Sequence, residues 1–131
     1  MPLSQAVDDR PTVLVVEDDD WLRDVVADIL ESSGYRVATA RNGWDAREYL
    51  ATVCDPPSAV LMDLMMPIVS GWEFLAGFRS EERFAATPIV VMTALDDTMP
   101  SGVDLVLRKP FRIDDLVATI DHFARAAVLL N

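Results

Sequence analysis

The sequence of 131 residues contains a single cysteine, Cys54, and no long apolar run. One cysteine cannot form a disulfide within the chain, so the sequence fits a reducing compartment, and we expect Cys54 to be a small, half-buried packing residue. No stretch approaches the ~20 apolar residues of a membrane-spanning helix. The first residues are polar and acidic and lack the basic and apolar segments of a signal peptide. We therefore expect a cytoplasmic protein with no membrane partner.

Positive charge is also scarce. The chain has 11 Lys and Arg residues against 22 Asp and Glu residues, which gives a formal net charge of −11. A surface of this charge repels phosphate backbones, so we expect no direct nucleic-acid partner. The excess of acids either serves solubility or reflects carboxylates gathered around a cation, and the positions of the acids decide between the two.

The remaining composition, with 51% hydrophobic residues, is that of one ordinary globular domain. Residues 1–11 are predicted to be a disordered lead-in that ends at Pro11, and residues 12–128 the folded domain. Within it, short apolar runs alternate with apolar residues at helical spacing. The predicted strands are Thr12–Val16, Tyr35–Thr39, Ser58–Met62, Ile89–Met92 and Val103–Leu107. Helical patterns cover residues 22–30, 46–53 and 74–78, and a last helix buries Ile113, Leu116, Val117, Ile120 and Ala124 on one face.

Strict alternation of strands and helices, with strands that are apolar on both faces, predicts an α/β fold with a doubly wound parallel sheet. Five strands favour the flavodoxin-like order 2-1-3-4-5. The connection between the fourth and fifth strands is short, because residues 94–102 number only nine and include Pro100 and Gly102. A helical crossover needs at least ~10–12 residues, so we expect the helix between these strands to be short or missing.

Polar side chains follow four of the five predicted strands. Glu17 and Asp18 follow the first strand, Asp63 the third, Thr93 the fourth and Lys109 the fifth. In the order 2-1-3-4-5 the first and third strands flank the point where the topology reverses, and α/β sheets bind ligands beyond the carboxyl ends of such strands. The fold therefore predicts that three carboxylates, a hydroxyl and an ammonium group meet at one edge.

Three carboxylates at such short range repel one another, and a hard divalent cation removes the conflict. Oxygen ligands with few direct carboxylates suit Mg²⁺, which retains water and accepts a phosphate oxygen. Lys109 and Thr93 then resemble phosphate ligands, and Asp63 is the candidate nucleophile, since carboxylates form aspartyl-phosphate intermediates. Taken one at a time, the acids of residues 17–20 have a simpler explanation as helix-capping residues, with Asp19 or Asp20 as the N-cap. Likewise, Thr93 taken alone could simply be a β-forming residue at the end of a strand, and Lys109 taken alone could be a solvated surface lysine.

With these residues in place, the sequence resembles a response-regulator receiver domain of two-component signalling, with a fold like that of a stand-alone chemotaxis regulator. The stretches "VLVVEDD", "VLMDLMMPIVSGWEFL", "PIVVMTA" and "LRKPF" carry the resemblance. It implies that Asp63 accepts a phosphoryl group from a histidine, while Lys109 pairs with the phosphate and Thr93 bonds a phosphoryl oxygen. It also implies a cis bond before Pro110. The implied Mg²⁺ ligands are Asp18 directly, Glu17 through water, Asp63 and the backbone carbonyl of Met65.

The resemblance also implies partners: a histidine kinase or histidine phosphotransfer protein as donor, and a separate downstream protein. The expected function is phosphoacceptor signalling, in which the domain can catalyse its own phosphorylation and dephosphorylation but is not a metabolic enzyme. One alternative is a receiver-like interaction module that is never phosphorylated. Another is a Mg²⁺-dependent phosphohydrolase, which would want an acid/base carboxylate soon after the nucleophile, where this chain has Met65.

Two departures from the family pattern concern the surface that partners would read. Three residues before Lys109, where many members carry Tyr or Phe, this chain has Val106. A missing fourth helix should leave parts of the fourth and fifth strands, Val106 included, more exposed. We therefore expect partner binding or a homodimer through the fifth strand and the last helix. We also expect residues 95–102 to exchange their amide hydrogens as fast as a loop.

Overall fold

The computed structural model describes residues 9–65, 71–94 and 102–125, which form five strands and four α-helices in the predicted order. The strands are β1 (Thr12–Val16), β2 (Arg36–Ala40), β3 (Ala59–Asp63), β4 (Ile89–Thr93) and β5 (Leu105–Arg108). The helices are α1 (Asp20–Ser32), α2 (Gly43–Thr52), α3 (Gly71–Ser80) and α4 (Ile113–Ile120), with a 3₁₀ turn η2 (Glu82–Phe84) after α3 and a π-helical turn η3 (Asp121–Arg125) after α4. Strand ends differ from the sequence prediction by at most two residues, and those of β1 coincide with it. The predicted lead-in, residues 1–11, lies mostly outside the described residues.

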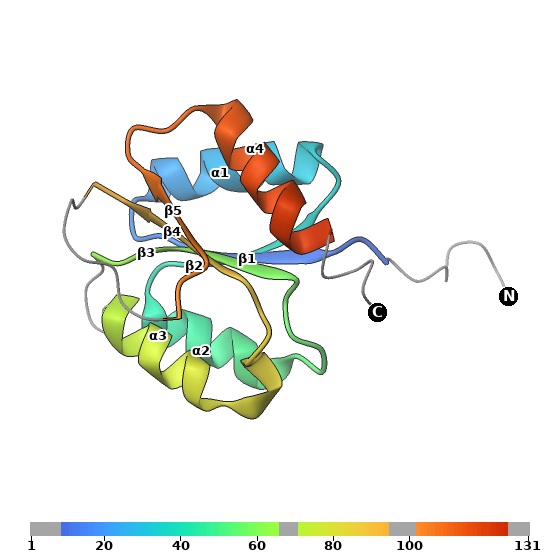
Figure 1. Ribbon diagram of the computed structural model, residues 1–131, viewed down its shortest axis with the longest axis vertical. Helices are drawn as coiled ribbons and strands as arrows, with labels where there is room; N and C mark the ends of the chain where they lie inside the picture. Colours follow the sequence, from blue (N-terminus) through green and yellow to red (C-terminus); the bar gives the residue numbers. More distant parts are fainter. Residues whose placement is uncertain (1–8, 66–70, 95–101, 126–131) are drawn as a thin grey trace, which may run out of the picture.

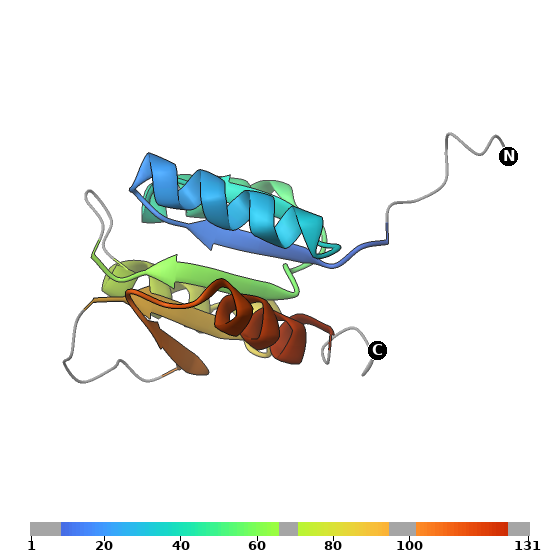
Figure 2. The ribbon, with the colours of Figure 1, turned by 90° about the horizontal axis from the view of Figure 1, so that it is seen from above.

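The five strands form one parallel sheet in the order β2-β1-β3-β4-β5, which confirms the predicted doubly wound topology. The register brings the carboxyl ends of the strands to one edge, since Val16 lies opposite both Ala40 and Met62, and Asp63 opposite Met92. The arrowheads of β1 and β3 point toward this edge in Figure 2. The sheet thus carries the residues that follow each strand to the same end of the molecule.

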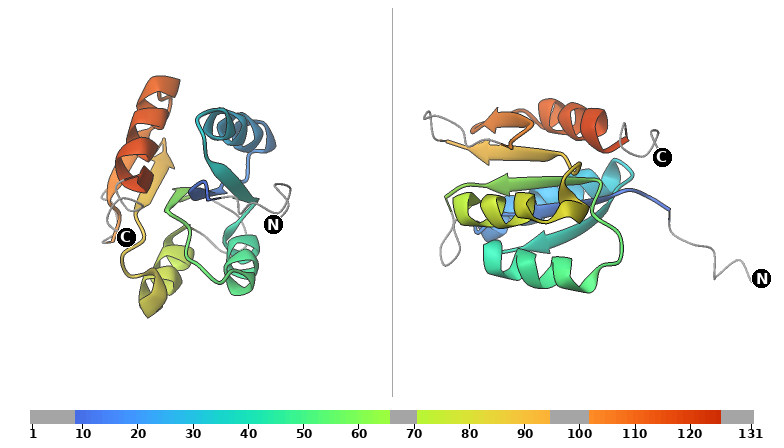
Figure 3. Two further views of the ribbon diagram at one scale, coloured as in Figure 1. Left: turned by 90° about the vertical axis from the view of Figure 1, so that its right-hand side faces the viewer. Right: turned by 60° about the horizontal axis from the view of Figure 1, so that its bottom comes forward.

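Helices cover both faces of the sheet, with α1 and α4 on one face and α2 and α3 on the other (Figure 1; Figure 3, left). Alternate residues of β1 belong to two separate cores. Leu14 and Val16 pack on the α2–α3 side, and Val13 and Val15 pack on the α1–α4 side. Strands β3 and β4 are buried at all five positions. Strands buried on both faces explain why these runs are apolar without alternation.

Local sequence sets the ends of α1. The Asp19 side chain accepts a hydrogen bond from the backbone N–H of Leu22, so Asp19 is the N-cap that the run of acids predicted. Beyond the helix, Gly34 has φ 103°, a left-handed conformation that favours glycine and ends the helix as predicted. The helix therefore begins directly after the acidic residues that follow β1.

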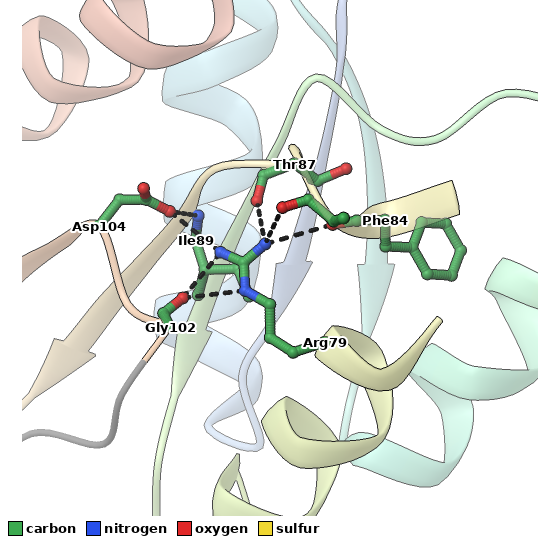
Figure 4. A network of polar contacts seen from close by, with 7 residues as sticks. Arg79, Phe84, Thr87, Ile89, Gly102 and Asp104 are labelled. Atoms are coloured by element: carbon green, nitrogen blue, oxygen red, sulfur yellow. Dashed lines mark hydrogen bonds and ion pairs between the residues drawn. The ribbon is translucent and has the colours of Figure 1, made fainter. Parts of the chain in front are cut away.

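No helix occurs among the described residues between β4 and β5, which are residue 94 and residues 102–104. Arg79, at the end of α3, holds the returning chain (Figure 4). Its Nη2 donates to the carbonyl of Gly102 at 2.7 Å and to the Asp104 carboxylate at 3.1 Å, and its Nη1 donates to the Thr87 carbonyl at 2.8 Å. The predicted fast amide exchange concerns residues 95–102, which lie almost wholly outside the described residues.

The structure corrects the prediction that part of β4 is left exposed. The α2–α3 core includes Ile89 and Val91, and the α1–α4 core includes Val90 and Met92, so both faces of β4 are covered. In β5, Leu105 is exposed, while Val106 is half-buried against the α2–α3 core. Of the two strands, only β5 has exposed residues.

Two single-residue predictions are also wrong. Cys54 is exposed, because it lies in the loop between α2 and β3 rather than under a packed element. Ile113 is 56% exposed, although Leu116, Ile120 and Ala124 are buried as predicted and Val117 is half-buried. Ile113 is the first residue of α4, so it lies at the end of the helix rather than in its packed middle.

Candidate functional site at the carboxyl edge of the sheet

The predicted polar residues meet at the carboxyl edge. Glu17 and Asp18 directly follow β1, Asp63 is the last residue of β3, Thr93 is the last residue of β4, and Lys109 follows β5. Glu17 and Thr93 are wholly buried and Asp63 is 7% exposed, whereas Asp18 is exposed. The site therefore has one exposed carboxylate, that of Asp18, and two buried ones, those of Glu17 and Asp63.

Lys109 joins the two buried carboxylates. Its Nζ lies 2.7 Å from Asp63 Oδ2 and 2.8 Å from Glu17 Oε1. The remaining oxygens accept backbone bonds: Asp63 Oδ1 accepts from the N–H of Met65 at 2.9 Å, and Glu17 Oε2 accepts from the N–H of Asp18 at 3.0 Å. Each buried carboxylate oxygen thus has a donor, as buried charge requires.

Burial and neighbouring charges shift the pKa values of Glu17 and Lys109. Burial raises the pKa of Glu17 to about 7, the hydrogen bond from Lys109 lowers it in part, and the charge of Asp63 raises it again. Burial lowers the pKa of Lys109, but the bonds to Asp63 and Glu17 outweigh this effect, so its pKa stands above the usual value. A single ammonium group therefore compensates the buried acids only partly, which leaves a site that favours a further cation.

The three carboxylates are close enough to share an ion. One oxygen from each of Glu17, Asp18 and Asp63 can be chosen so that all three lie within 4.8 Å of one another. Such an all-oxygen donor set suits a hard divalent cation like Mg²⁺. The acidic pocket is consistent with the magnesium site predicted from the sequence.

Comparison with known families bears on this arrangement. The sequence profile of the response regulator receiver domain matches residues 13–121, which is most of the chain. The chain belongs to this family. Its general role is that of a signalling module in two-component signal transduction rather than a metabolic enzyme.

The receiver domain has relatives of known sequence and structure. Response regulator Rre1 of Synechocystis is 36% identical over 116 residues, which cover 83% of this chain and 49% of Rre1. The chain therefore spans about half the length of that relative. Among solved structures, the chemotaxis response regulator CheY4 of Vibrio cholerae matches with a TM-score of 0.78 at 28% identity, and the match covers 87% of this chain and 98% of that one.

A second solved structure is informative about metals. The receiver domain of the sensor histidine kinase PA1611 from Pseudomonas aeruginosa holds a magnesium ion in its active-site cleft. It matches this chain with a TM-score of 0.80 at 26% identity, and the match covers 88% of this chain and 98% of that one.

The structure also describes three other parts of the expected site: the Lys109 backbone, the Lys109–Pro110 peptide bond and Met65. The backbone N–H of Lys109 donates to the carbonyl of Thr93 at 2.8 Å, which fixes the loop that carries the lysine beside β4. The Lys109–Pro110 peptide bond is cis, as the resemblance implied. Met65 has a backbone N–H bonded to Asp63 and a side chain that is 60% exposed; the role of its carbonyl stays a prediction.

Two residues that support the site, Arg23 and Gly71, were not predicted from the sequence to do so. Arg23 donates to the backbone carbonyl of Glu17 at 3.0 Å and to Asp20 at 2.6 Å, and so secures the turn between β1 and α1. Gly71 begins α3 against the end of β3, where an added Cβ would lie 2.5 Å from Leu64 Cα. Arg23 gave no signal in the helical pattern, and Gly71 could be predicted only as a helix start.

The part of the chain that the structure describes has no helix that is both long and apolar enough to cross a bilayer.

Proposed function

We propose that this receiver domain accepts a phosphoryl group on Asp63 from a phosphohistidine of a partner protein. The observation that carries the proposal is the contact of Lys109 Nζ with Asp63 Oδ2 at 2.7 Å, beside the carboxylates of Glu17 and Asp18. Asp63 ends β3 at the carboxyl edge and is 7% exposed. A phosphoryl donor can therefore reach this carboxylate only from outside that edge.

The residues of the chain prepare Asp63 for attack. The Met65 N–H holds Oδ1 and the Lys109 ammonium holds Oδ2, so the carboxylate is fixed in orientation. When an Asp63 oxygen forms a bond to phosphorus, the bond between phosphorus and the donor's ring nitrogen breaks, and that nitrogen leaves with the electron pair. Lys109 then lies beside the new phosphoryl oxygens, and Thr93 at the end of β4 is the proposed hydroxyl donor to them.

Magnesium fits the donor set on chemical grounds, since only oxygen ligands are offered and three carboxylates outnumber one lysine. We assign Asp18 and Asp63 as direct ligands, Glu17 as a ligand through water, and the carbonyl of Met65 as a further ligand. When bound, the ion would neutralise negative charge on the transferring phosphoryl group. Glu17 is wholly buried whereas Asp18 is exposed, which agrees with a direct role for Asp18.

The proposed partners follow from this chemistry. The donor is a histidine kinase or a histidine phosphotransfer protein, and the readout passes to a separate downstream protein. The aspartyl phosphate ends by hydrolysis, in which water displaces Asp63 from phosphorus. A homodimer through β5 and α4 is the proposed alternative form of output, because Leu105 is exposed on that strand.

Intact-mass spectrometry tests the proposal. Incubation with acetyl phosphate and Mg²⁺ should add one phosphoryl group, about 80 Da, to a carboxylate of the parent protein. Asp63→Asn should remove the gain, whereas Asp45→Asn, an acid on α2 outside the site, should retain it. An adduct that persists in Asp63→Asn would contradict the assignment. A parent protein that gains no mass would favour the interaction module that is never phosphorylated.

A further inference from the structure

A cavity of about 390 Å³ lies at the end of the sheet opposite the carboxyl edge. This end, from which the strands run toward the carboxyl edge (Figure 2), is the amino edge. We call the space the amino-edge cavity; it is lined by residues 9–12, Arg36, Tyr49 and residues 53–58. Its walls are therefore the chain that enters β1, the starts of β1 and β2, the last turn of α2 and the loop after it. A volume of this size lies within the range of small-molecule sites, about 300–1,000 Å³.

Hydrogen bonds between these segments hold the walls of the cavity together. The N–H of Arg36 donates to the carbonyl of Pro11 at 2.9 Å, and the N–H of Ser58 donates to the carbonyl of Thr12 at 2.8 Å. The side chain of Arg36 joins the same walls, since its Nε donates to the carbonyl of Arg10 at 3.3 Å. The cavity is thus formed by bonded segments of the fold, and a ligand that enters it has little chain to order.

One part of the cavity offers a cation and a hydroxyl group. Arg36 is exposed and makes no ion pair within the part of the chain that the structure describes. Tyr49 packs its ring against the α2–α3 core, while its hydroxyl group has no hydrogen-bond partner among the described residues. Burial raises the pKa of Tyr49 and the charge of Arg36 lowers it in part, so the two side chains lie within electrostatic reach. A guanidinium fork beside a phenol hydroxyl is a donor set that suits a carboxylate.

The same cavity also carries acids, which restricts the ligand further. Asp9 and Asp55 line it, both are exposed, and neither is paired with a cation in the described ranges 9–65, 71–94 and 102–125. These carboxylates repel a ligand that is only an anion, and they attract an ammonium group. Free amino acids carry both a carboxylate and an ammonium group at neutral pH. Val53 and Pro56 add apolar surface to the lining, as small-molecule sites do.

We propose that the amino-edge cavity binds a free amino acid with an apolar side chain, whose carboxylate lies between Arg36 and Tyr49 and whose ammonium group faces Asp55. The apolar side chain of the ligand packs on Val53 and Pro56. The inference does not rest on the proposed function, because the cavity and the phosphorylation site lie at opposite ends of the sheet. Exposed ion pairs contribute little each, so for a ligand of about 12 non-hydrogen atoms the expected Kd is on the order of 1 mM.

Cys54 supplies the assay, because it is the single cysteine of the chain, is exposed and lines the cavity. A bound ligand should slow the alkylation of this thiol by iodoacetamide, which carries no charge. Amide NMR spectra of the ¹⁵N-labelled full chain show where the ligand binds. The ligands are phenylalanine, N-acetylphenylalanine, which lacks the ammonium group, and phenylalaninamide, which lacks the carboxylate. Glycylphenylalanine, whose charges lie farther apart, represents dipeptides.

Variants of the chain test the assigned contacts. Arg36→Gln and Asp55→Asn each remove one charge, and Tyr49→Phe removes only the hydroxyl group. The matched controls are Arg41→Gln and Asp28→Asn, which remove exposed groups of the same two kinds outside the cavity. Circular dichroism checks that every variant is folded.

We expect phenylalanine to slow alkylation with a midpoint on the order of 1 mM and to shift the amides of Arg36, Tyr49 and residues 53–58. Loss of either charge from the ligand, or of either charge from the cavity, should weaken binding about 3- to 10-fold, and the controls should match the parent. Tyr49→Phe should weaken binding about 2- to 5-fold.

Four results would overturn the proposal. The first is the absence of both protection and amide shifts at about 20 mM phenylalanine, far above the expected Kd. The second is N-acetylphenylalanine or phenylalaninamide binding as tightly as phenylalanine, and the third is equal binding by the cavity variants and their controls. Tighter binding of glycylphenylalanine than of phenylalanine would assign the cavity to dipeptides instead.

Discussion

At the scale of single residues, the site is a balance between buried acids and one ammonium group. Lys109 contacts both Asp63 and Glu17, and burial leaves the pKa of Glu17 raised to about 7. The sequence predicted this meeting of charges because each residue stands at or directly after the end of a strand. It could not predict how the oxygens are shared, since this depends on side-chain directions that only the folded edge defines.

The unequal surroundings of Glu17 and Asp18 lead to a prediction about metal affinity. Asp18→Asn should weaken Mg²⁺ binding by about tenfold or more, because a direct ligand is lost. Glu17→Gln should weaken it less, because Glu17 is assigned a contact with the ion through water. Isothermal titration calorimetry with MgCl₂ measures both affinities. A larger loss in Glu17→Gln than in Asp18→Asn would reverse the assigned roles.

At the scale of elements, the start of α3 is set by close backbone contact with the end of β3. A Cβ on Gly71 would lie 2.5 Å from Leu64 Cα and 2.7 Å from the carbonyl oxygen of Asp63. These are backbone atoms that cannot rotate away. A glycine before a helical pattern predicts a helix start, but the sequence holds no sign that the third strand passes so near.

Gly71→Ala should therefore destabilise the fold by about 1–3 kcal/mol, as forced overpacking does, and should slow phosphorylation by displacing the loop after Asp63. Gly77→Ala on the same helix is a matched control, because its Cβ would meet only the flexible Arg47 side chain, at 3.4 Å. This control should gain up to about 1 kcal/mol from helix propensity. Urea denaturation measures both. Equal stability of the two variants would show that the contact is not restrictive.

Among the described residues, the Arg79 side chain makes several of the bonds that hold the connection between β4 and β5. The nine-residue spacing predicted a reduced helix, but nothing in the sequence marked Arg79 as the side chain that binds the returning strand. Its guanidinium donates to carbonyls of η2 and the following loop, to Gly102 and to Asp104. A planar group with five donors can satisfy acceptors on several segments at once.

Arg79→Lys should lower the free energy of unfolding by about 1–3 kcal/mol, because a lysine retains the charge and loses the fork of donors. Amide exchange at Gly102 and Asp104 should accelerate with it. The control is Arg41→Lys, whose side chain is 70% exposed and has one ion pair, with Asp45; it should change stability by less than about 0.5 kcal/mol. If both variants are equally stable, the network of Figure 4 does not hold the connection.

At the scale of the whole molecule, the candidate functional residues lie at one end of the sheet, the carboxyl edge. The carboxyl edge gathers the three carboxylates and most of the large apolar side chains that are exposed among the described residues. The alternation of strand and helix predicted that edge, since parallel strands all end there. The exposures of Cys54 and Ile113 were predicted wrongly because they depend on which elements cover a residue. Helical spacing gives the direction of a side chain but not whether anything lies beneath it.

The most direct measurement is the chemical identity of the phosphorylated residue. The protein is treated with acetyl phosphate and Mg²⁺, and the product is reduced with borohydride, which converts an aspartyl phosphate to homoserine while leaving free carboxylates unchanged. Peptide mass spectrometry then locates the homoserine. The account predicts homoserine at position 63 and at no other acid, in an amount that falls when EDTA removes the metal. Homoserine at position 18, or at an acid away from the carboxyl edge, would contradict it.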